Sequence, residues 1–359
     1  MDQKLLIVDA SNVNTGGGLV LLNGMIEEAS SFGTSLIFYV DKRASVISSG
    51  NGFIEFVKPN AIRRLICKFS IAFRAVFSPG EATVLSFGNF PNPFWRGRQI
   101  TYVHNYFLVG NDWRESVKSI ARFRLMLKRA TFRILNAAST SDYMVQTATM
   151  ASATRAVVGR KKKVSVVPVM TFSHLSTSIR TKRRKDGEAV FCYVSLGGEN
   201  KNHLALVSAW KKLAERGYCP KLIITLESHI DHALYAGQVE KLIEEFLPHV
   251  VNLGKVAPNR VVEIYSESDA LIFPSFTESF GLGLIEAAAS GLDIIASDRS
   301  YVYDVVSPDY VFDPTDVESI VAAVIKYVDH GVDAEKKKTG GMIEKIVNPA
   351  EFLKKCQNS

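Results

Sequence analysis

The sequence has little cysteine and no long apolar run, and these two shortages already narrow the class of protein. Its 359 residues include four cysteines, none of them in the C-x-x-C spacing of zinc or redox motifs. We expect free thiols in a reducing compartment and no structural metal. No apolar stretch reaches the roughly 18 residues of a membrane-spanning helix, and Asp2 and Asp9 flank the short apolar run at the N-terminus. We therefore expect a cytoplasmic protein without a signal peptide or a transmembrane helix.

The charge of the chain is distributed unevenly. Its length predicts two domains, at about 100 to 200 residues each. Residues 1–185 contain 27 Lys and Arg against 10 Asp and Glu, a net charge of +17, whereas residues 186–359 contain 16 against 26, a net charge of −10. A basic half predicts a polyanionic partner, either nucleic acid or an anionic membrane surface. A solvated basic face without a partner is the alternative.

Short runs rich in Val and Ile alternate with longer amphipathic stretches, which is the pattern of β-α units around buried parallel sheets. We therefore predict an α/β fold with two doubly wound, Rossmann-like domains. The expected strands are Leu5–Asp9, Ser35–Val40, Phe53–Val57, Thr83–Phe87, Ile100–Val103 and Ser165–Val167 in the first domain, and Val190–Val194, Lys221–Thr225, Val250–Leu253, Ala270–Phe273 and Asp293–Ala296 in the second.

The domain boundaries follow from breaks in this pattern. The first domain is expected over residues 1–177 and the second over residues 189–332. The basic segment 178–188 lacks apolar periodicity and reads as a linker. Residues 333–359 form a Lys-rich helical segment that is able to cross back to the first domain.

A glycine-rich turn follows the first expected strand. Gly16, Gly17 and Gly18 stand where a helix begins, so backbone N–H groups there can approach an anion closely. A dinucleotide fingerprint is one alternative, because Asp41 ends the next strand as a ribose-binding acid would. Leu21 occupies the position of its third glycine, which argues against that alternative. A flexible turn without a ligand is the other alternative.

Two glutamates flank a helix start near the end of the second domain. The segment Phe280–Gly283 opens an Ala-rich helix, whose first N–H groups and positive dipole end suit a diphosphate. Glu278 precedes that helix start and Glu286 lies about one turn inside it. Carboxylates beside a phosphate site are suited to accept hydrogen bonds from ribose and sugar hydroxyls. The constellation indicates a nucleotide-sugar ligand.

The segment PSFTESFGLGLIEAAASG resembles the E-x7-E motif of retaining GT-B glycosyltransferases of family 4 (group 1), of the bacterial surface-polysaccharide type that builds O-antigen or capsule. The glycine turn at 14–18, His104 in TYVHN and the segment YVSLGGENKNH from Tyr193 to His203 resemble further motifs of that family. The resemblance covers nearly the whole chain. It implies a GT-B fold, in which two Rossmann-like domains face a central cleft.

The same resemblance implies a role for each matched residue. Lys201 takes one donor phosphate, the backbone at Phe280–Leu282 takes another, Glu286 binds the ribose, and Glu278 and His104 act at the reacting sugar. Many family members have an Arg where this chain has Ser195, which concerns how the diphosphate charge is offset. The implied catalytic residues are Glu278, His104 and Lys201, and the implied donor-binding residues are Gly16, Gly17, Gly18, Ser195, Lys201, Asn202, Ser279, Phe280, Gly281, Leu282 and Glu286.

Two segments of the basic half combine cations with large apolar residues. They run from 61 to 77, with Arg63, Arg64, Lys68 and Arg74, and from 114 to 137, with Lys118, Arg122, Arg124, Lys128, Arg129 and Arg133. Basic amphipathic helices of this kind are typical of membrane surfaces. No nucleic-acid-binding motif is found, so we expect an anionic membrane and no nucleic acid. We expect electrostatics to supply most of the attraction, so that salt releases the protein.

These observations predict a retaining glycosyltransferase that moves a hexose-type sugar from a UDP- or GDP-sugar to a hydroxyl of a lipid-linked glycan in surface polysaccharide synthesis. The expected location is the inner face of the cytoplasmic membrane. No Asp-x-Asp occurs, so we expect no metal and no other cofactor. The alternatives are a GT-B nucleotide-sugar epimerase or hydrolase, and a nucleotide-binding module of this fold that has lost turnover.

Overall fold

The computed structural model describes residues 4–29, 35–46, 53–78, 80–111, 119–171, 189–227, 233–246, 248–332 and 345–358. These residues form two compact units. The first is made of residues up to 171 together with 345–358, and the second of residues 189–332. The expected linker 178–188 and residues 333–344 of the expected C-terminal segment lie outside the described residues.

The first unit is built on a parallel sheet of seven strands in the order β3-β2-β1-β4-β5-β6-β7. The strands are β1 (Leu5–Ala10), β2 (Ser35–Asp41), β3 (Phe53–Val57), β4 (Ala82–Ser86), β5 (Gln99–Val103), β6 (Asp142–Val145) and β7 (Val164–Val166). Both faces of β1 are buried, which is why its sequence is a continuous apolar run.

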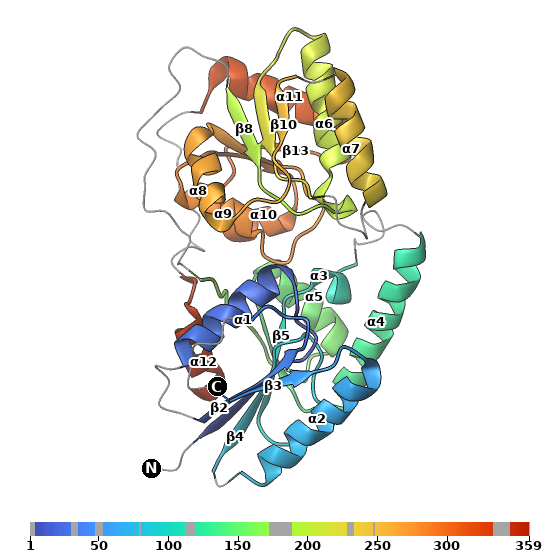
Figure 1. Ribbon diagram of the computed structural model, residues 1–359, viewed down its shortest axis with the longest axis vertical. Coiled ribbons are helices and arrows are strands. Elements are labelled where there is room, and N and C mark those ends of the chain that lie inside the picture. The colour runs from blue at the N-terminus through green and yellow to red at the C-terminus, as the bar shows by residue number, and fades with distance from the viewer. Residues whose placement is uncertain are drawn as a thin grey trace. The chain divides into compact units, whose positions relative to one another are not determined.

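Helices cover this sheet (Figure 1). They are α1 (Gly16–Glu28), α2 (Ala61–Val76), α3 (Tyr106–Val109), α4 (Ser119–Ala137), α5 (Ala148–Val158) and α12 (Pro349–Asn358). The last of these comes from the C-terminal end of the chain and lies beside α1. Its buried Phe352, Leu353 and Cys356 complete the core cluster that contains Leu22 and Met25 of α1. The first unit therefore depends on a segment that follows the second in sequence.

The second unit has a parallel sheet of six strands in the order β10-β9-β8-β11-β12-β13. The strands are β8 (Val190–Tyr193), β9 (Lys221–Ile224), β10 (Val250–Asn252), β11 (Ala270–Phe273), β12 (Asp293–Ser297) and β13 (Tyr310–Phe312). The helices are α6 (His203–Glu215), α7 (Ala233–Phe246), α8 (Pro258–Glu267), α9 (Leu282–Ala289), α10 (Ser300–Val305) and α11 (Val317–His330), with a short 3-10 turn at Glu199–Lys201.

The predicted fold class of two doubly wound, Rossmann-like units is confirmed. Two strands were not predicted. Strand β6 has four residues and begins with Asp142, and β13 is a three-residue edge strand, so neither has the apolar run that reveals the others.

Each sheet has a point where the strand order reverses, between β1 and β4 in the first unit and between β8 and β11 in the second. Ligands of doubly wound folds bind beyond the carboxyl ends of the strands at such points. In the first unit, the glycine turn follows β1 and His104 follows β5. In the second, Lys201 follows β8 and Glu278 follows β11. The predicted site residues therefore lie at the carboxyl edges of the two sheets.

Candidate active site

Lys201 and Glu278 form an ion pair in the second unit. Their side chains are 77 positions apart in sequence, and the Lys201 Nζ lies 2.6 Å from the Glu278 Oε1. The Lys201 side chain is 23% exposed and the Glu278 side chain 13% exposed, so the pair is largely shielded from solvent but still reachable by a ligand. The structure thus brings together two of the three residues for which a catalytic role is implied.

Tyr193 and Asn202 hold the two loops around this pair in place. The Tyr193 hydroxyl contacts the Lys201 carbonyl oxygen at 3.0 Å and the Ser275 hydroxyl at 2.9 Å. Asn202 adopts a left-handed backbone, and its side-chain amide donates to the carbonyl oxygens of Pro274 and Pro314. Burial raises the pKa of Tyr193, so its hydroxyl stays neutral. Sequence reasoning missed Tyr193, because a tyrosine at the end of a buried strand looks like a core residue.

Helix α9 begins one residue after a glycine. Gly281 has a φ of +74° and caps the helix without any side-chain hydrogen bond. The first-turn N–H groups at Leu282 and Gly283 consequently receive no side-chain acceptor from the capping residue. The predicted phosphate-binding residues Phe280–Leu282 therefore form a helix entrance whose positive end has no protein carboxylate at its cap.

Glu286 lies inside α9, where it accepts a hydrogen bond from the Tyr265 hydroxyl at 3.2 Å. Burial raises the pKa of Glu286 to about 7, and the hydrogen bond from Tyr265 offsets only part of that effect. A carboxyl with this pKa changes its charge near neutral pH, so a ligand that donates hydrogen bonds to it favours the ionised form. Tyr265 is a second residue that sequence reasoning missed.

Ser195 and Ser279 complete the predicted donor residues of this unit. The Ser195 hydroxyl donates to the Leu196 carbonyl oxygen at 3.0 Å, and its backbone N–H donates to the Thr225 hydroxyl. Its side chain is therefore engaged with the backbone beside it. Ser279 lies half-buried in the loop between Glu278 and Phe280.

His104 and Asn89 form the polar centre of the first unit's edge. The His104 backbone N–H donates to Asn89 Oδ1 at 2.8 Å, which turns the Asn89 amide nitrogen toward the ring Nε2 at 3.1 Å. Because that nitrogen donates, Nε2 accepts and the proton resides on Nδ1. The Nδ1 atom is buried and has no partner within the described residues. Burial lowers the pKa of His104 to about 4, so the ring offers a neutral N–H donor at pH 7.

The glycine turn lies directly beside this histidine. A Cβ placed on Gly18 would come within 3.2 Å of the His104 Nε2, so a larger residue there would press on the ring. Gly16 has a φ of +66°, and both Gly16 and Gly17 face open space. The structure therefore joins Gly18 with His104 and leaves the first two glycines accessible to a ligand.

The structure contradicts the alternative of a dinucleotide fingerprint, because its proposed ribose-binding acid, Asp41, is already occupied by protein groups. Asp41 is fully buried, and its carboxylate contacts the Arg43 guanidinium at 2.9 Å and the Arg64 guanidinium at 3.0 Å. These arginines and the Arg43 backbone N–H outweigh burial and hold the pKa of Asp41 below its usual value. Both carboxylate oxygens are occupied, so Asp41 is a structural acid.

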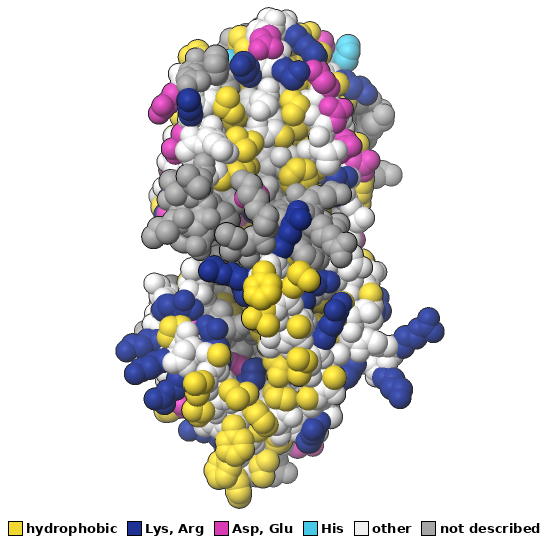
Figure 2. Space-filling view, turned by 90° about the vertical axis from the view of Figure 1, so that its right-hand side faces the viewer, with side chains coloured by type: hydrophobic (Ala, Val, Ile, Leu, Met, Phe, Trp, Pro, Cys, Tyr) yellow, Lys and Arg dark blue, Asp and Glu magenta, His cyan; other side chains and the backbone are white. Residues whose placement is uncertain are grey.

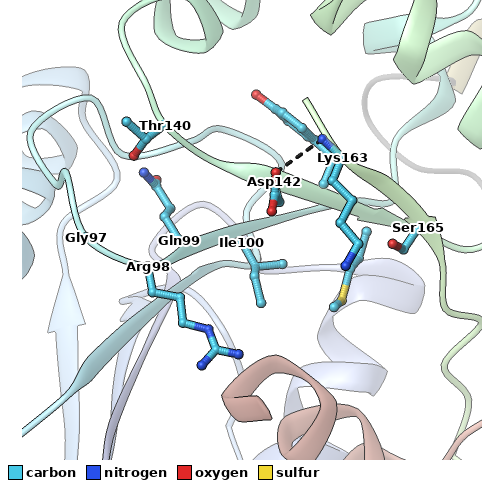
Figure 3. A pocket seen from close by; sticks show the side chains of 10 residues that line it. Gly97, Arg98, Gln99, Ile100, Thr140, Asp142, Lys163 and Ser165 are labelled. Atoms are coloured by element: carbon cyan, nitrogen blue, oxygen red, sulfur yellow. Dashed lines mark hydrogen bonds between the residues drawn. The ribbon is translucent and has the colours of Figure 1, made fainter. Parts of the chain in front are cut away.

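A hollow in the first unit lies at the amino ends of the strands, opposite the carboxyl ends that position His104 (Figure 3). It is lined by residues at the amino ends of β5, β6 and β7, including Gln99, Asp142 and Lys163. The Lys163 backbone N–H donates to Asp142 there at 3.2 Å. The strands run parallel, so this hollow is remote from His104 and does not belong to the candidate active site.

The comparisons with known proteins agree with this architecture. The lipopolysaccharide outer core galactosyltransferase WaaB superposes with a TM-score of 0.67 at 16% identity, over 99% of both chains. HepE of Anabaena, in complex with UDP and glucose, superposes with a TM-score of 0.63 at 13% identity, over 98% of this chain and 95% of that one. The fold is therefore that of the two-domain GT-B glycosyltransferases.

Sequence comparison finds relatives mainly for the second unit. Residues 176–340 match the family Glycosyl transferases group 1. The chain is 29% identical over 152 residues to the O-antigen chain mannosyltransferase RfbU of Salmonella typhimurium. That match covers 42% of each chain, so the chain spans about two fifths of this curated relative. The segment 176–340, which matches this family, contains Lys201, Glu278 and Glu286.

Proposed function

We propose that the protein is a retaining glycosyltransferase of family 4, which moves a hexose from a nucleotide diphosphate sugar to a hydroxyl of a glycan acceptor. The observation that carries the proposal is the Lys201–Glu278 ion pair at the carboxyl edge of the sheet, within the matched domain and close in sequence to the α9 entrance and Glu286. A cation, uncapped N–H groups and two carboxylates suit a diphosphate joined to two hydroxylated rings.

The donor enters by exchanging one anion for another. In the free protein, Lys201 neutralises Glu278. A bound diphosphate takes over the Lys201 ammonium group and the first N–H groups of α9, which releases the Glu278 carboxylate to the sugar. Glu286 accepts hydrogen bonds from the ribose hydroxyls. Lys201 thus exchanges a carboxylate partner for the diphosphate, and the Glu278 carboxylate accepts hydrogen bonds from the sugar hydroxyls in place of its cation.

Transfer begins when the bond between the sugar and the diphosphate breaks. Negative charge develops on the leaving phosphate, and Lys201 with the α9 N-terminus is placed to stabilise it. The sugar becomes oxocarbenium-like, and the acceptor hydroxyl attacks on the face that the diphosphate leaves, which retains the configuration. Glu278 stabilises the positive charge, and the neutral His104 ring is proposed to act at the reacting sugar. We propose that no metal is needed, because the lysine and the helix take the place of a bridging cation.

The proposed donor is a UDP- or GDP-sugar, and the proposed acceptor is a lipid-linked glycan of a surface polysaccharide at the inner face of the membrane. HepE binds UDP and glucose, and RfbU is an O-antigen mannosyltransferase, which supports both choices. Among the described residues, none of the helices has the length and apolarity to cross a bilayer.

The test is donor turnover with and without acceptor. The purified protein is incubated with UDP- and GDP-hexoses, with a lipid-linked glycan, and with EDTA in a parallel sample. We expect transfer with an α linkage from an α donor that survives EDTA. Sugar release or epimerisation without acceptor would show that the protein is a hydrolase or an epimerase and not a transferase. Activity that EDTA abolishes and Mn²⁺ restores would contradict metal independence.

A further inference from the structure

Helix α2 presents its large apolar side chains to solvent. Cys67, Ile71, Ala72 and Ala75 face the sheet and are small or medium in size. The outward side chains recur at helical spacing and keep 52% to 72% of their exposure. They are Ile62, Leu65, Ile66, Phe69, Phe73, Val76 and, just after the helix, Phe77. Monomeric soluble proteins rarely leave such a continuous apolar stripe uncovered.

Helix α4 repeats the same arrangement. Its inward residues are Arg129, Phe132 and Asn136. Phe123, Met126, Leu127 and Ile134 face outward at 59% to 73% exposure, and their spacing also follows one helix face. Figure 2 looks onto the side where α2 and α4 lie in Figure 1, and it shows hydrophobic side chains gathered over the first unit with Lys and Arg among them. We call these outward side chains of the two helices the apolar face.

Three of the cations that sequence analysis assigned to a membrane point inward instead. Lys68 contacts Asp9 at 2.8 Å and the Phe90 carbonyl oxygen at 2.9 Å. Arg64 contacts Asp41. Arg129 donates to the carbonyl oxygens of Phe107 and Gly110. These contacts fasten the two helices to the unit and engage three cations that the sequence analysis counted among those of the membrane-facing segments.

The exposed cations of α2 and α4 indicate which kind of partner the apolar face would bind. Neither Ala61–Phe77 nor Ser119–Ala138 contains an Asp or a Glu. Arg63, Arg124, Lys128 and Arg133 are exposed on these helices. Two copies of this face would bring like charges together, which disfavours self-association. A bilayer with anionic headgroups offers both an apolar interior for the stripes and negative charge for their flanks.

We propose that the apolar face inserts into the boundary between headgroups and acyl chains of an anionic membrane, with burial of apolar side chains as the main source of affinity. The inference rests on the proposed function for the identity of the acceptor, but the docking is measurable without turnover. It replaces the expectation of salt-released, mainly electrostatic binding. The tethers through Lys68 and Arg64 end at Asp9 and Asp41, at the carboxyl edge of the sheet.

The experiment is co-sedimentation of the full chain with vesicles of phosphatidylcholine containing 30% phosphatidylglycerol, at about 0.05 M and 0.5 M salt. The apolar variant is Phe69→Gln with Phe73→Gln and Leu127→Gln. The charge variant is Arg63→Gln with Lys128→Gln and Arg133→Gln. The matched control replaces exposed apolar residues of the second unit, Val251→Gln with Tyr303→Gln and Val311→Gln. Donor affinity is measured for every variant.

We expect the wild type to bind at both salt concentrations and the apolar variant to lose at least about tenfold at both. The charge variant should lose several-fold at low salt only, because salt already screens its contribution in the wild type. The control should bind as the wild type does. Equal vesicle binding by the apolar variant and the wild type overturns the proposal. So does a dimer of the wild type that the apolar variant abolishes while vesicles bind neither protein.

A second readout does not depend on how the triple variant folds. The three native tryptophans emit in every variant, so the signal of each introduced tryptophan is taken as the difference from the wild type. For Phe73→Trp this signal should shift to the blue and be quenched by brominated lipid, whereas for Tyr303→Trp it should not change. Quenching of neither probe, with vesicle binding intact, would place the contact elsewhere and overturn the proposal. Vesicle binding without donor binding would instead count against the proposed function alone.

Discussion

Helix α2 of the first unit and helix α11 of the second are similar in length but turn their apolar residues in opposite directions. In α11, Ile320, Val324 and Tyr327 are buried against the sheet. In α2, Phe69 and Phe73 are exposed, while Lys68 is buried. The periodicity of both sequences is helical, and only the partner of the apolar stripe differs. An amphipathic pattern therefore gives the period of a helix without saying which face is inside.

The two units also differ in how their cations are paired. The second unit uses its cations in pairs with carboxylates, as where Lys212 and Arg216 both contact Glu318. The first unit has exposed cations on helices that lack acidic residues. We interpret the second unit as the donor-binding half and the first as the half that meets the acceptor and its membrane.

The largest effect is expected from loss of the Lys68–Asp9 ion pair, which holds α2 against the sheet. Lys68→Met leaves the Asp9 carboxylate buried without its cation, which costs about 3 to 5 kcal/mol. Lys68 and Ser11 outweigh burial and hold the pKa of Asp9 below its usual value, so the pair is present at neutral pH and lost as acid protonates Asp9. Hydrogen exchange of the α2 amides reports the loss within the first unit. Arg63→Met, on the exposed face, should change exchange little, and equal effects of the two would contradict the inward assignment.

Lys201→Ala should lower turnover at least about a hundredfold, because it removes one group that stabilises the leaving diphosphate. The control is Lys212→Ala, which removes an exposed cation of the same unit whose partner is Glu318. Initial rates at saturating donor separate the chemical step from binding. A near-normal rate for Lys201→Ala would mean that another group offsets the phosphate charge.

Glu278→Gln tests whether the diphosphate takes the place of the Glu278 carboxylate at Lys201. The variant removes the carboxylate that competes with the diphosphate for Lys201, so the nucleoside diphosphate should bind at least as tightly as it does to the wild type. Turnover should fall, because the charge on the oxocarbenium-like sugar loses its stabilising group. Calorimetry and initial rates together decide. Weaker nucleotide binding with unchanged turnover would reverse the assigned role.

The smallest effect concerns the pH dependence of donor binding. Burial raises the pKa of Glu286 to about 7, and the ionised carboxylate is the stronger acceptor for ribose hydroxyls. Donor affinity should therefore rise several-fold between pH 6 and pH 8 in the wild type and stay level in Glu286→Gln. Without donor, stability of the second unit should fall as pH rises from the ordinary glutamate range toward 7, because the unfolded chain ionises this carboxyl more readily. Calorimetry across this pH range is the check.

The sequence predicts the strands that have long apolar runs and the loops that contain the motifs. It does not predict β13, which has three residues at a sheet edge. It also leaves open that Lys201 contacts Glu278, because that contact joins loops 77 positions apart and depends on the order of β8 and β11. The inward direction of Lys68 follows from Asp9 on a different element, so the pattern of α2 alone does not reveal it.

The most direct test of donor binding by the second unit is a thermal-shift panel of UDP- and GDP-sugars against the wild type and Glu286→Ala. A donor at a hundred times its dissociation constant should stabilise the wild type by about 2.7 kcal/mol. Loss of a charged hydrogen bond should weaken that donor's affinity for Glu286→Ala by about 1 to 3 kcal/mol, so the shift at the same concentration should shrink. Stabilisation of both proteins to the same extent, or of neither by any of these sugars, would contradict the assignment.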